Sequence, residues 1–173
     1  MKTRIVNADI TQIPVPAIAT SVNSGRLWNG MVDMVITRNG GKFLYEKLAE
    51  ALDSGLIGKQ GDTMHVIGKP DHAAFESIIY VIDDLILPVQ DITFNVLAAA
   101  LSLGLPSVVI PAFRTGRVRG LAEPTVADAV KGIAQGIARF NMTYPDSELE
   151  LFVCIYNNPE LEALLGKQLQ ISA

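Results

Sequence analysis

Short apolar runs that suit β-strands alternate with helical segments along the sequence, and this alternation constrains the fold most. The run SVVIPA (107–112) carries no charge and is apolar at nearly every position, as in a strand buried on both faces of a sheet. The predicted strands span 3–8, 17–22, 62–68, 77–83, 107–112 and 150–156. The predicted helices span 31–41, 42–55, 91–104, 123–140 and 159–169.

This order of elements predicts an α/β protein. Strands that alternate with helices become parallel because each crossover helix packs back onto the sheet. About six strands and five helices therefore predict one sheet with helices on both faces. Neither a repeat nor a low-complexity linker is evident in the 173 residues, so we expect a single domain over 1–173.

Local signals predict where several helices begin and end. Gly55 stands where a glycine commonly follows the last turn of a helix. Asp91 is expected to cap the helix that follows it, and Pro124 is expected near the first turn of the next helix.

The overall charge excludes some classes of partner. A net charge of −4 and a pI of about 5.1 disfavour binding to long nucleic acid or to an anionic membrane surface. The uncharged segment Ile92–Phe113 contains Gly104 and Pro106, so it is interpreted as helix, turn and strand and not as a membrane span. Cys154 is the only cysteine and is expected in a buried strand. With no apolar targeting segment evident, a cytoplasmic location is expected.

A basic loop follows the buried strand. The sequence FRTGRVRG (113–120) holds three arginines, two glycines and a threonine. Glycine lets backbone N–H groups and a phosphate approach closely, and arginine adds charge-assisted hydrogen bonds. The loop therefore predicts a diphosphate site. The alternative is an exposed turn whose arginines only solubilise the surface.

A polar loop follows the strand predicted at 17–22. Asn23 can both donate and accept hydrogen bonds to a sugar hydroxyl. Asp33 begins the next helix, where the helix dipole favours a carboxylate, or it orients a water molecule. Trp28 is interpreted either as a partly buried anchor or as a ligand contact. Because ligands bind at the carboxyl ends of the strands in such sheets, this loop and 113–120 are expected to form one site.

Asp9 ends the first predicted strand and has two interpretations. Its carboxylate can bond to its own backbone in an Asx turn, or it can accept the amino group of an adenine. The glycine fingerprints of dinucleotide-binding and P-loop proteins are missing from the sequence. His65 and His72 are the only histidines and have no third ligand nearby, so no metal is expected.

Four segments in this order resemble the macro domain family, an ADP-ribose-binding module. NADIT (7–11) resembles the family's G-D-I-T. AIATSVNSGRLWNGMVDMVI (17–36) resembles A-I-V-N-A-A-N-x-x-L-x-G-G-G-V-D-x-A-I, and SVVIPAFRTGRVRG (107–120) resembles S-I-A-F-P-A-I-S-T-G-x-x-G. LFVCIYNNPELEAL (151–164) resembles the last strand and helix. The resemblance implies a three-layer α/β/α sandwich with a mixed, mostly parallel central sheet of about six strands.

The resemblance also implies roles for residues at matched positions. Asp9 would bind the adenine amino group with Ile10 beside it. Asn23 would contact the distal ribose and support catalysis, and Asp33 matches an aspartate implicated in ADP-ribosyl hydrolysis. The other implied ligand-binding residues are Asn29, Gly30, Met31 and Val32 near the diphosphate and distal ribose, Phe113, Arg114, Thr115, Gly116, Arg117, Val118, Arg119 and Gly120 in the diphosphate loop, and Tyr156 and Asn157 beside the adenine.

Some positions depart from the family pattern. Thr20 replaces the first Asn of N-A-A-N, and Gly30 is the one glycine left of the triplet, between Asn29 and Met31. The resemblance still implies binding of ADP-ribose or a derivative, with hydrolysis of a phosphate or of an ADP-ribosylated side chain from the distal ribose. A non-catalytic reader or sequestering module is the alternative. No cofactor is expected, and an ADP-ribosylated protein is a candidate partner.

Overall fold

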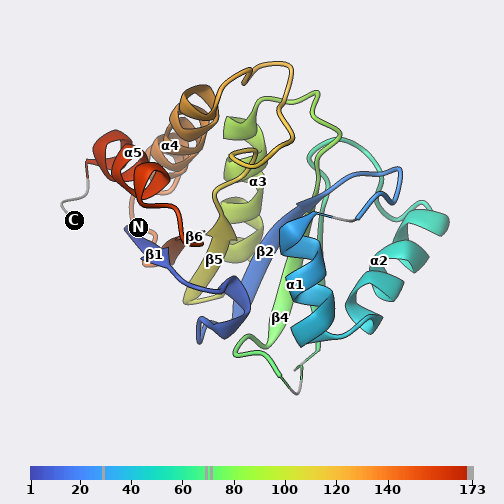
Figure 1. Cartoon of the computed structure of the whole chain (residues 1–173). Helices are drawn as coiled ribbons and strands as arrows, with labels where there is room; N and C mark the ends of the chain where they lie inside the picture. The colour runs from blue at the N-terminus through green and yellow to red at the C-terminus, as the bar shows by residue number, and fades with distance from the viewer. Residues whose placement is uncertain (29, 69, 71, 171–173) are drawn as a thin grey trace.

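The computed structural model describes residues 1–28, 30–68, 70 and 72–170, and in them a six-stranded sheet lies between two layers of helices (Figure 1). The strands are β1 (Lys2–Asn7), β2 (Ala17–Val22), β3 (Thr63–Ile67), β4 (Ser77–Ile82), β5 (Ser107–Pro111) and β6 (Glu150–Ile155). The helices are α1 (Met31–Gly40), α2 (Phe43–Asp53), α3 (Val89–Ser102), α4 (Val126–Thr143) and α5 (Pro159–Leu169), with a short 3₁₀ turn, η1 (Ile10–Gln12).

The sheet is mixed and mostly parallel, as the resemblance implied. Its strand order is β1-β6-β5-β2-β4-β3, and every neighbouring pair is parallel except β3 with β4. The carboxyl ends of the five parallel strands therefore meet at one edge of the sheet, where ligands bind in α/β proteins. Within the described residues no helix is long and apolar enough to cross a membrane.

The pairing of β2 is uneven along its length. With β4 it pairs at every residue, from Ala17 with Ser77 to Val22 with Ile82. With β5 it pairs only near the start, where Ala17 and Ile18 face Val108 and Val109. The carboxyl ends of β2 and β5 are therefore not held together by the sheet itself.

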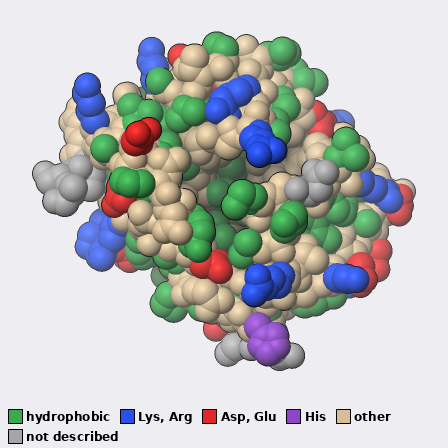
Figure 2. All heavy atoms as spheres, viewed as in Figure 1, with side chains coloured by type: hydrophobic (Ala, Val, Ile, Leu, Met, Phe, Trp, Pro, Cys, Tyr) green, Lys and Arg blue, Asp and Glu red, His purple; other side chains and the backbone are tan. Residues whose placement is uncertain are grey.

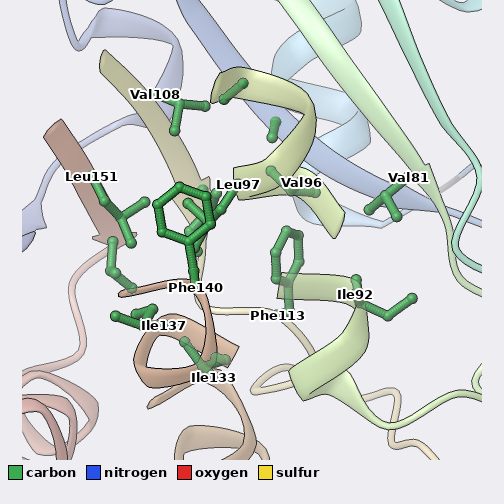
Figure 3. Packing of buried hydrophobic residues seen from close by; sticks show 14 of the residues in the cluster. Val81, Ile92, Val96, Leu97, Val108, Phe113, Ile133, Ile137, Phe140 and Leu151 are labelled. Carbon is green, nitrogen blue, oxygen red and sulfur yellow. The ribbon is translucent and has the colours of Figure 1, made fainter. Parts of the chain in front are cut away.

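Alternate side chains of the central strands enter two separate cores. Ala17 and Ala19 of β2 belong to the core that α3, α4 and α5 cover, while Ile18 and Val22 belong to the core under α1 and α2. Figure 3 shows part of the first core, built from sheet residues and the inner faces of α3 and α4. Burial on both faces explains why the central strands have uninterrupted apolar runs.

The predicted elements are confirmed, with two corrections at helix ends. Helix α3 begins at Val89 after Pro88, so Asp91 lies in its first turn and is not its cap; its carboxylate bonds Arg139 at 2.6 Å. Helix α4 begins at Val126 because Thr125 accepts a hydrogen bond from the backbone N–H of Asp128, which leaves Pro124 outside the helix. Gly55, with φ of 71°, follows α2 as predicted.

Candidate functional site

Three loops meet at the carboxyl edge of the sheet. One connects β2 to α1, the loop 83–88 follows β4, and the loop 112–125 follows β5. Because α1 and α4 pack on opposite faces of the sheet, the first and last of these loops lead in opposite directions and leave a crevice between them. Figure 2 shows a hollow there, between the loop after β5 and the start of α1, with Lys or Arg side chains above it and hydrophobic side chains around it.

The loop after β5 begins in the core. The ring of Phe113 is 2% exposed and points into the cluster near Ile92 and Val96 (Figure 3). The hydroxyl of Thr115 donates to Ala112 O at 2.7 Å and closes a turn. Any ligand contact from Phe113 is therefore left to its backbone, and this buried ring anchors the loop.

Arg114 forms the centre of a buried ionic cluster. Its Nε donates to Asp83 at 3.1 Å, its Nη1 bonds Glu123, and its Nη2 bonds both Asp83 and Leu87 O. The side chains of the three charged residues are only 1–4% exposed. Burial alone would lower the pKa of Arg114, but the bonds to Asp83 and Glu123 raise it, so the guanidinium stays charged. Arg114 also has a φ of 58°, a conformation that a side chain rarely adopts unless its surroundings fix it.

The other two arginines of this loop differ from each other. Arg119 donates to the carbonyl oxygens of Arg114 at 2.9 Å and Val118 at 3.0 Å, and also bonds Gly116 O, so its guanidinium closes the loop on itself. Arg117 is exposed and makes no hydrogen bond or ion pair within the described part of the chain. Of the three arginines, Arg117 is the one whose charge is available to an anion.

The two glycines of the loop also differ. A Cβ at Gly116 would meet nothing within 4 Å, so the backbone there is open to a ligand. A Cβ at Gly120 would overlap Nη1 of Arg114 and Oε2 of Glu123 and would lie 2.9 Å from Arg114 Cζ. Gly120 therefore makes room for the buried ionic cluster, a reason for glycine that the sequence did not suggest.

Asn23 shapes the loop after β2. Its Nδ2 donates to Leu27 O and its Oδ1 accepts from Leu27 N, both at 2.9 Å. Its carbonyl oxygen accepts from Trp28 Nε1 at 3.0 Å, and the indole packs on Tyr45 with ring centroids 5.5 Å apart. An amide retains one more N–H and a further lone pair, so Asn23 can still bind a ligand. The structure favours Trp28 as a partly buried anchor.

Asp33 lies half-buried in the first turn of α1. Its Oδ1 accepts from the hydroxyl of Tyr45 at 2.8 Å, and its Oδ2 accepts from the backbone N–H of Gly30 at 3.2 Å. Burial raises the pKa of Asp33, and these two hydrogen bonds only partly oppose the effect. Tyr80, fully buried behind Tyr45, has a raised pKa from burial and from the charge of Asp33, and its hydroxyl has no partner in the described residues.

Asp9 is in the Asx-type arrangement that the sequence left open. Its Oδ1 accepts from Thr11 N at 2.9 Å and from Thr11 Oγ1 at 2.7 Å, which starts η1. Its other oxygen accepts no hydrogen bond from the residues that the structure describes. Ile10, beside it, is buried at 7% exposure. The adenine role of Asp9 stays a prediction, and its second carboxylate oxygen is free of bonds to the described residues to fulfil it.

The remaining predicted residues lie on several different elements and differ in exposure. Tyr156 is 62% exposed after β6, and Asn157 adopts a φ of 48° while its N–H donates to Asn7 Oδ1 at 2.9 Å. Met31 and Val118 are 74% and 59% exposed, whereas Val32 packs on the core under α1. Asn29 lies outside the described residues. No group of three or more possible metal ligands occurs in the described part.

Comparisons with known proteins identify this architecture. No protein-family model matches the sequence, and no curated protein matches it. Among solved structures, the macrodomain of Oceanobacillus iheyensis with ADP gives a TM-score of 0.79 at 20% identity, over 97% of this chain and 90% of that chain. The chain has the macrodomain fold. The Trypanosoma brucei macrodomain in complex with ADP-ribose gives 0.76 at 18% identity, over 95% of this chain and 68% of that one.

A further macrodomain agrees with this assignment. The macro domain of ganglioside induced differentiation associated protein 2 gives a TM-score of 0.74 at 18% identity, over 99% of this chain and 86% of that chain. The fold that the four sequence segments implied is therefore confirmed over most of the chain.

Sequence reasoning missed three acidic residues at the edge of this macrodomain fold. Asp83 and Glu123 hold Arg114, and Asp84 accepts from Ser24 N at 2.7 Å and Ser24 Oγ at 2.9 Å. The sequence held one signal for Asp83 and Asp84, which are adjacent aspartates directly after an apolar strand. Glu123 had no such signal, because its pairing with Arg114 depends on how the loop 112–125 folds back on itself.

Proposed function

We propose that this chain binds ADP-ribose or a close derivative in the crevice between the loops after β2 and β5. The observation that carries the proposal is the geometry of these loops, which follow neighbouring parallel strands that pair only near their starts. Crevices of this kind are where α/β sheets bind nucleotides. The solved macrodomains with ADP and with ADP-ribose support this class of nucleotide.

The loop 113–120 would bind the diphosphate. Gly116 leaves its backbone open, and Arg117 brings a positive charge that no described residue uses. Arg114 and Arg119 would act indirectly, since their guanidinium groups are already bonded within the protein. A local positive charge of this kind suits a small anion in a protein whose net charge is −4.

The adenine would lie where β1 and β6 end side by side. The second oxygen of Asp9 can accept the exocyclic amino group, while the first oxygen keeps its bonds to Thr11. Tyr156, exposed after β6, offers an aromatic surface next to it.

Calorimetric titration with ADP-ribose, AMP and ribose 5-phosphate tests this function. ADP-ribose should bind more tightly than either fragment because it alone reaches both ends of the crevice. No measurable binding of ADP-ribose rejects the proposal. Equal affinity for AMP would show that the diphosphate and distal ribose are not recognised.

Hydrolysis at the distal ribose is a second candidate, and Asp33 favours it. A carboxylate whose pKa is raised by burial is a better general base than an exposed one. It would take a proton from a water molecule while the water oxygen attacks C1″ of the distal ribose. A new C1″–O bond forms as the bond from C1″ to the phosphate or to the protein side chain breaks, and the leaving group departs with that electron pair and takes up a proton. The free N–H of Asn23 would help to orient the ribose.

Turnover separates this enzyme from a non-catalytic reader. Protein at high concentration is mixed with ADP-ribose 1″-phosphate or with a mono-ADP-ribosylated protein, and the release of phosphate or free ADP-ribose is followed. Release that falls in an Asn23→Ala variant, with binding retained, supports catalysis. Binding without release leaves the reader or sequestering function.

A further inference from the structure

The loop 83–88 contacts both loops of the proposed site. Asp84 holds Ser24 in the loop after β2 through bonds of 2.7 and 2.9 Å. The preceding residue, Asp83, holds the buried guanidinium of Arg114 in the loop after β5. Adjacent carboxylates therefore bind the two opposite walls of the crevice.

Backbone bonds strengthen the same connection. The N–H of Asp83 donates to Val22 O at 2.7 Å, at the end of β2. The N–H of Leu121 donates to Leu85 O at 3.1 Å, which ties the far end of the loop after β5 to the same segment. Among the described residues, no hydrogen bond joins the loop after β2 directly to the loop after β5.

The sheet does not provide this connection by itself. β4 pairs with β2 as far as Ile82 and Val22, so the loop 83–88 starts from a fixed place beside β2. β5 pairs with β2 only at Val108 and Val109, so no ladder pairing joins these two strands beyond Val109. The position of Arg114, in an unfavourable backbone conformation, therefore depends on its bonds to Asp83, Leu87 and Glu123.

We propose that Asp83 and Asp84 are positioning residues that couple the two walls of the crevice, so that each loop presents its ligand contacts only while the other is held. The ligand in this inference rests on the proposed function. Loops that are already fixed lose less conformational entropy on binding, which raises affinity without a new ligand contact. Neither aspartate needs to touch the ligand.

Hydrogen exchange and calorimetry of an Asp84→Asn variant test the coupling. Asp84 bonds Ser24 and makes no hydrogen bond to the described residues of the loop 113–120, yet exchange of the amides in that loop should rise, together with exchange at 23–28. Affinity for ADP-ribose should fall about tenfold, the loss expected when charge-assisted hydrogen bonds that order a site are removed. Ser24→Ala, which removes only a hydroxyl, should give a smaller change in the same direction.

Glu150→Gln is the matched control. Glu150 forms an ion pair with Arg4 at 2.7 Å at the opposite edge of the sheet, so the variant removes one negative charge far from the crevice. It should leave both exchange at 113–120 and ADP-ribose affinity unchanged.

The outcomes separate the coupling from the ligand assignment. Faster exchange in both loops supports the coupling even if the wild-type protein fails to bind ADP-ribose, in which case only the proposed function is rejected. Faster exchange confined to 23–28, with 113–120 as in the wild type, overturns the coupling. If Asp84→Asn does not fold, the same criterion applies to Ser24→Ala.

Discussion

Gly116 and Gly120 lie four residues apart in one loop, and the same substitution should lower stability strongly at Gly120 but not at Gly116. Neither has a positive φ, so alanine fits the backbone at both positions. A methyl group at Gly120 would overlap the guanidinium of Arg114 and the carboxylate of Glu123, and it must push the buried ion pairs apart. A methyl group at Gly116 would enter open space.

The magnitudes follow from burial. Breaking a buried ion pair by loss of one partner costs about 3–5 kcal/mol because the other charge is left unpaired. Displacing the partners of an ion pair is less severe than removing one of them, so Gly120→Ala should lower the free energy of unfolding by about 3 kcal/mol, the lower end of that range. Gly116→Ala should change it little, or raise it by about 0.4–1 kcal/mol because the unfolded chain loses freedom.

Urea denaturation of the two variants measures the difference, and titration with ADP-ribose completes the comparison. Gly116→Ala should keep its stability but bind ADP-ribose more weakly, because its methyl group enters the space proposed for the diphosphate. Gly120→Ala within about 0.5 kcal/mol of the wild type would refute the reasoning, since the ion pairs could then move at no cost.

Three other predictions concern Asp33, Asp9 and Arg117. Burial raises the pKa of Asp33 above 3.8, so the folded state binds the proton of this carboxyl more tightly than the unfolded state does. The stability that this proton contributes to the wild-type protein should therefore be lost as pH rises from about 3.8 through the raised pKa. Urea denaturation across that range should show this loss reduced in Asp33→Asn; parallel curves would contradict it. Asp9→Ala should weaken ADP-ribose binding by about 1–3 kcal/mol in calorimetry, and unchanged affinity would remove the adenine assignment. Arg117→Ala should weaken binding and reduce its salt dependence without lowering the melting temperature, whereas an unchanged salt dependence would show that Arg117 does not meet the phosphates.

Much of the candidate site could be located from the sequence, but its internal bonding could not. Glycine, arginine and asparagine after apolar strands indicated which loops end at the crevice, because strand ends in a parallel sheet meet at one edge. Three neighbouring arginines in the sequence looked equivalent. Folding buried Arg114 in a cluster with Asp83 and Glu123, turned Arg119 onto its own loop, and left Arg117 exposed.

The exact helix boundaries also became clear only from the structure. Pro124 and Asp91 both had the chemistry of helix starts, yet Thr125 capped one helix and Pro88 preceded the other. Helix α4 starts where Thr125 and Asp128 form a local capping box. At α3 the carboxylate of Asp91 caps nothing and instead bonds Arg139, which lies 48 positions away.

The sequence by itself determined the order of strands and helices, the layers of the fold and the loops that end at the crevice, because apolar periodicity and turn residues act over a few neighbouring positions. The tertiary structure alone decided how far β2 and β5 pair, which arginine remains available and which carboxylates hold the two loops. These depend on residues such as Asp83, Arg114 and Glu123, whose distances in space bear no relation to their spacing in the chain.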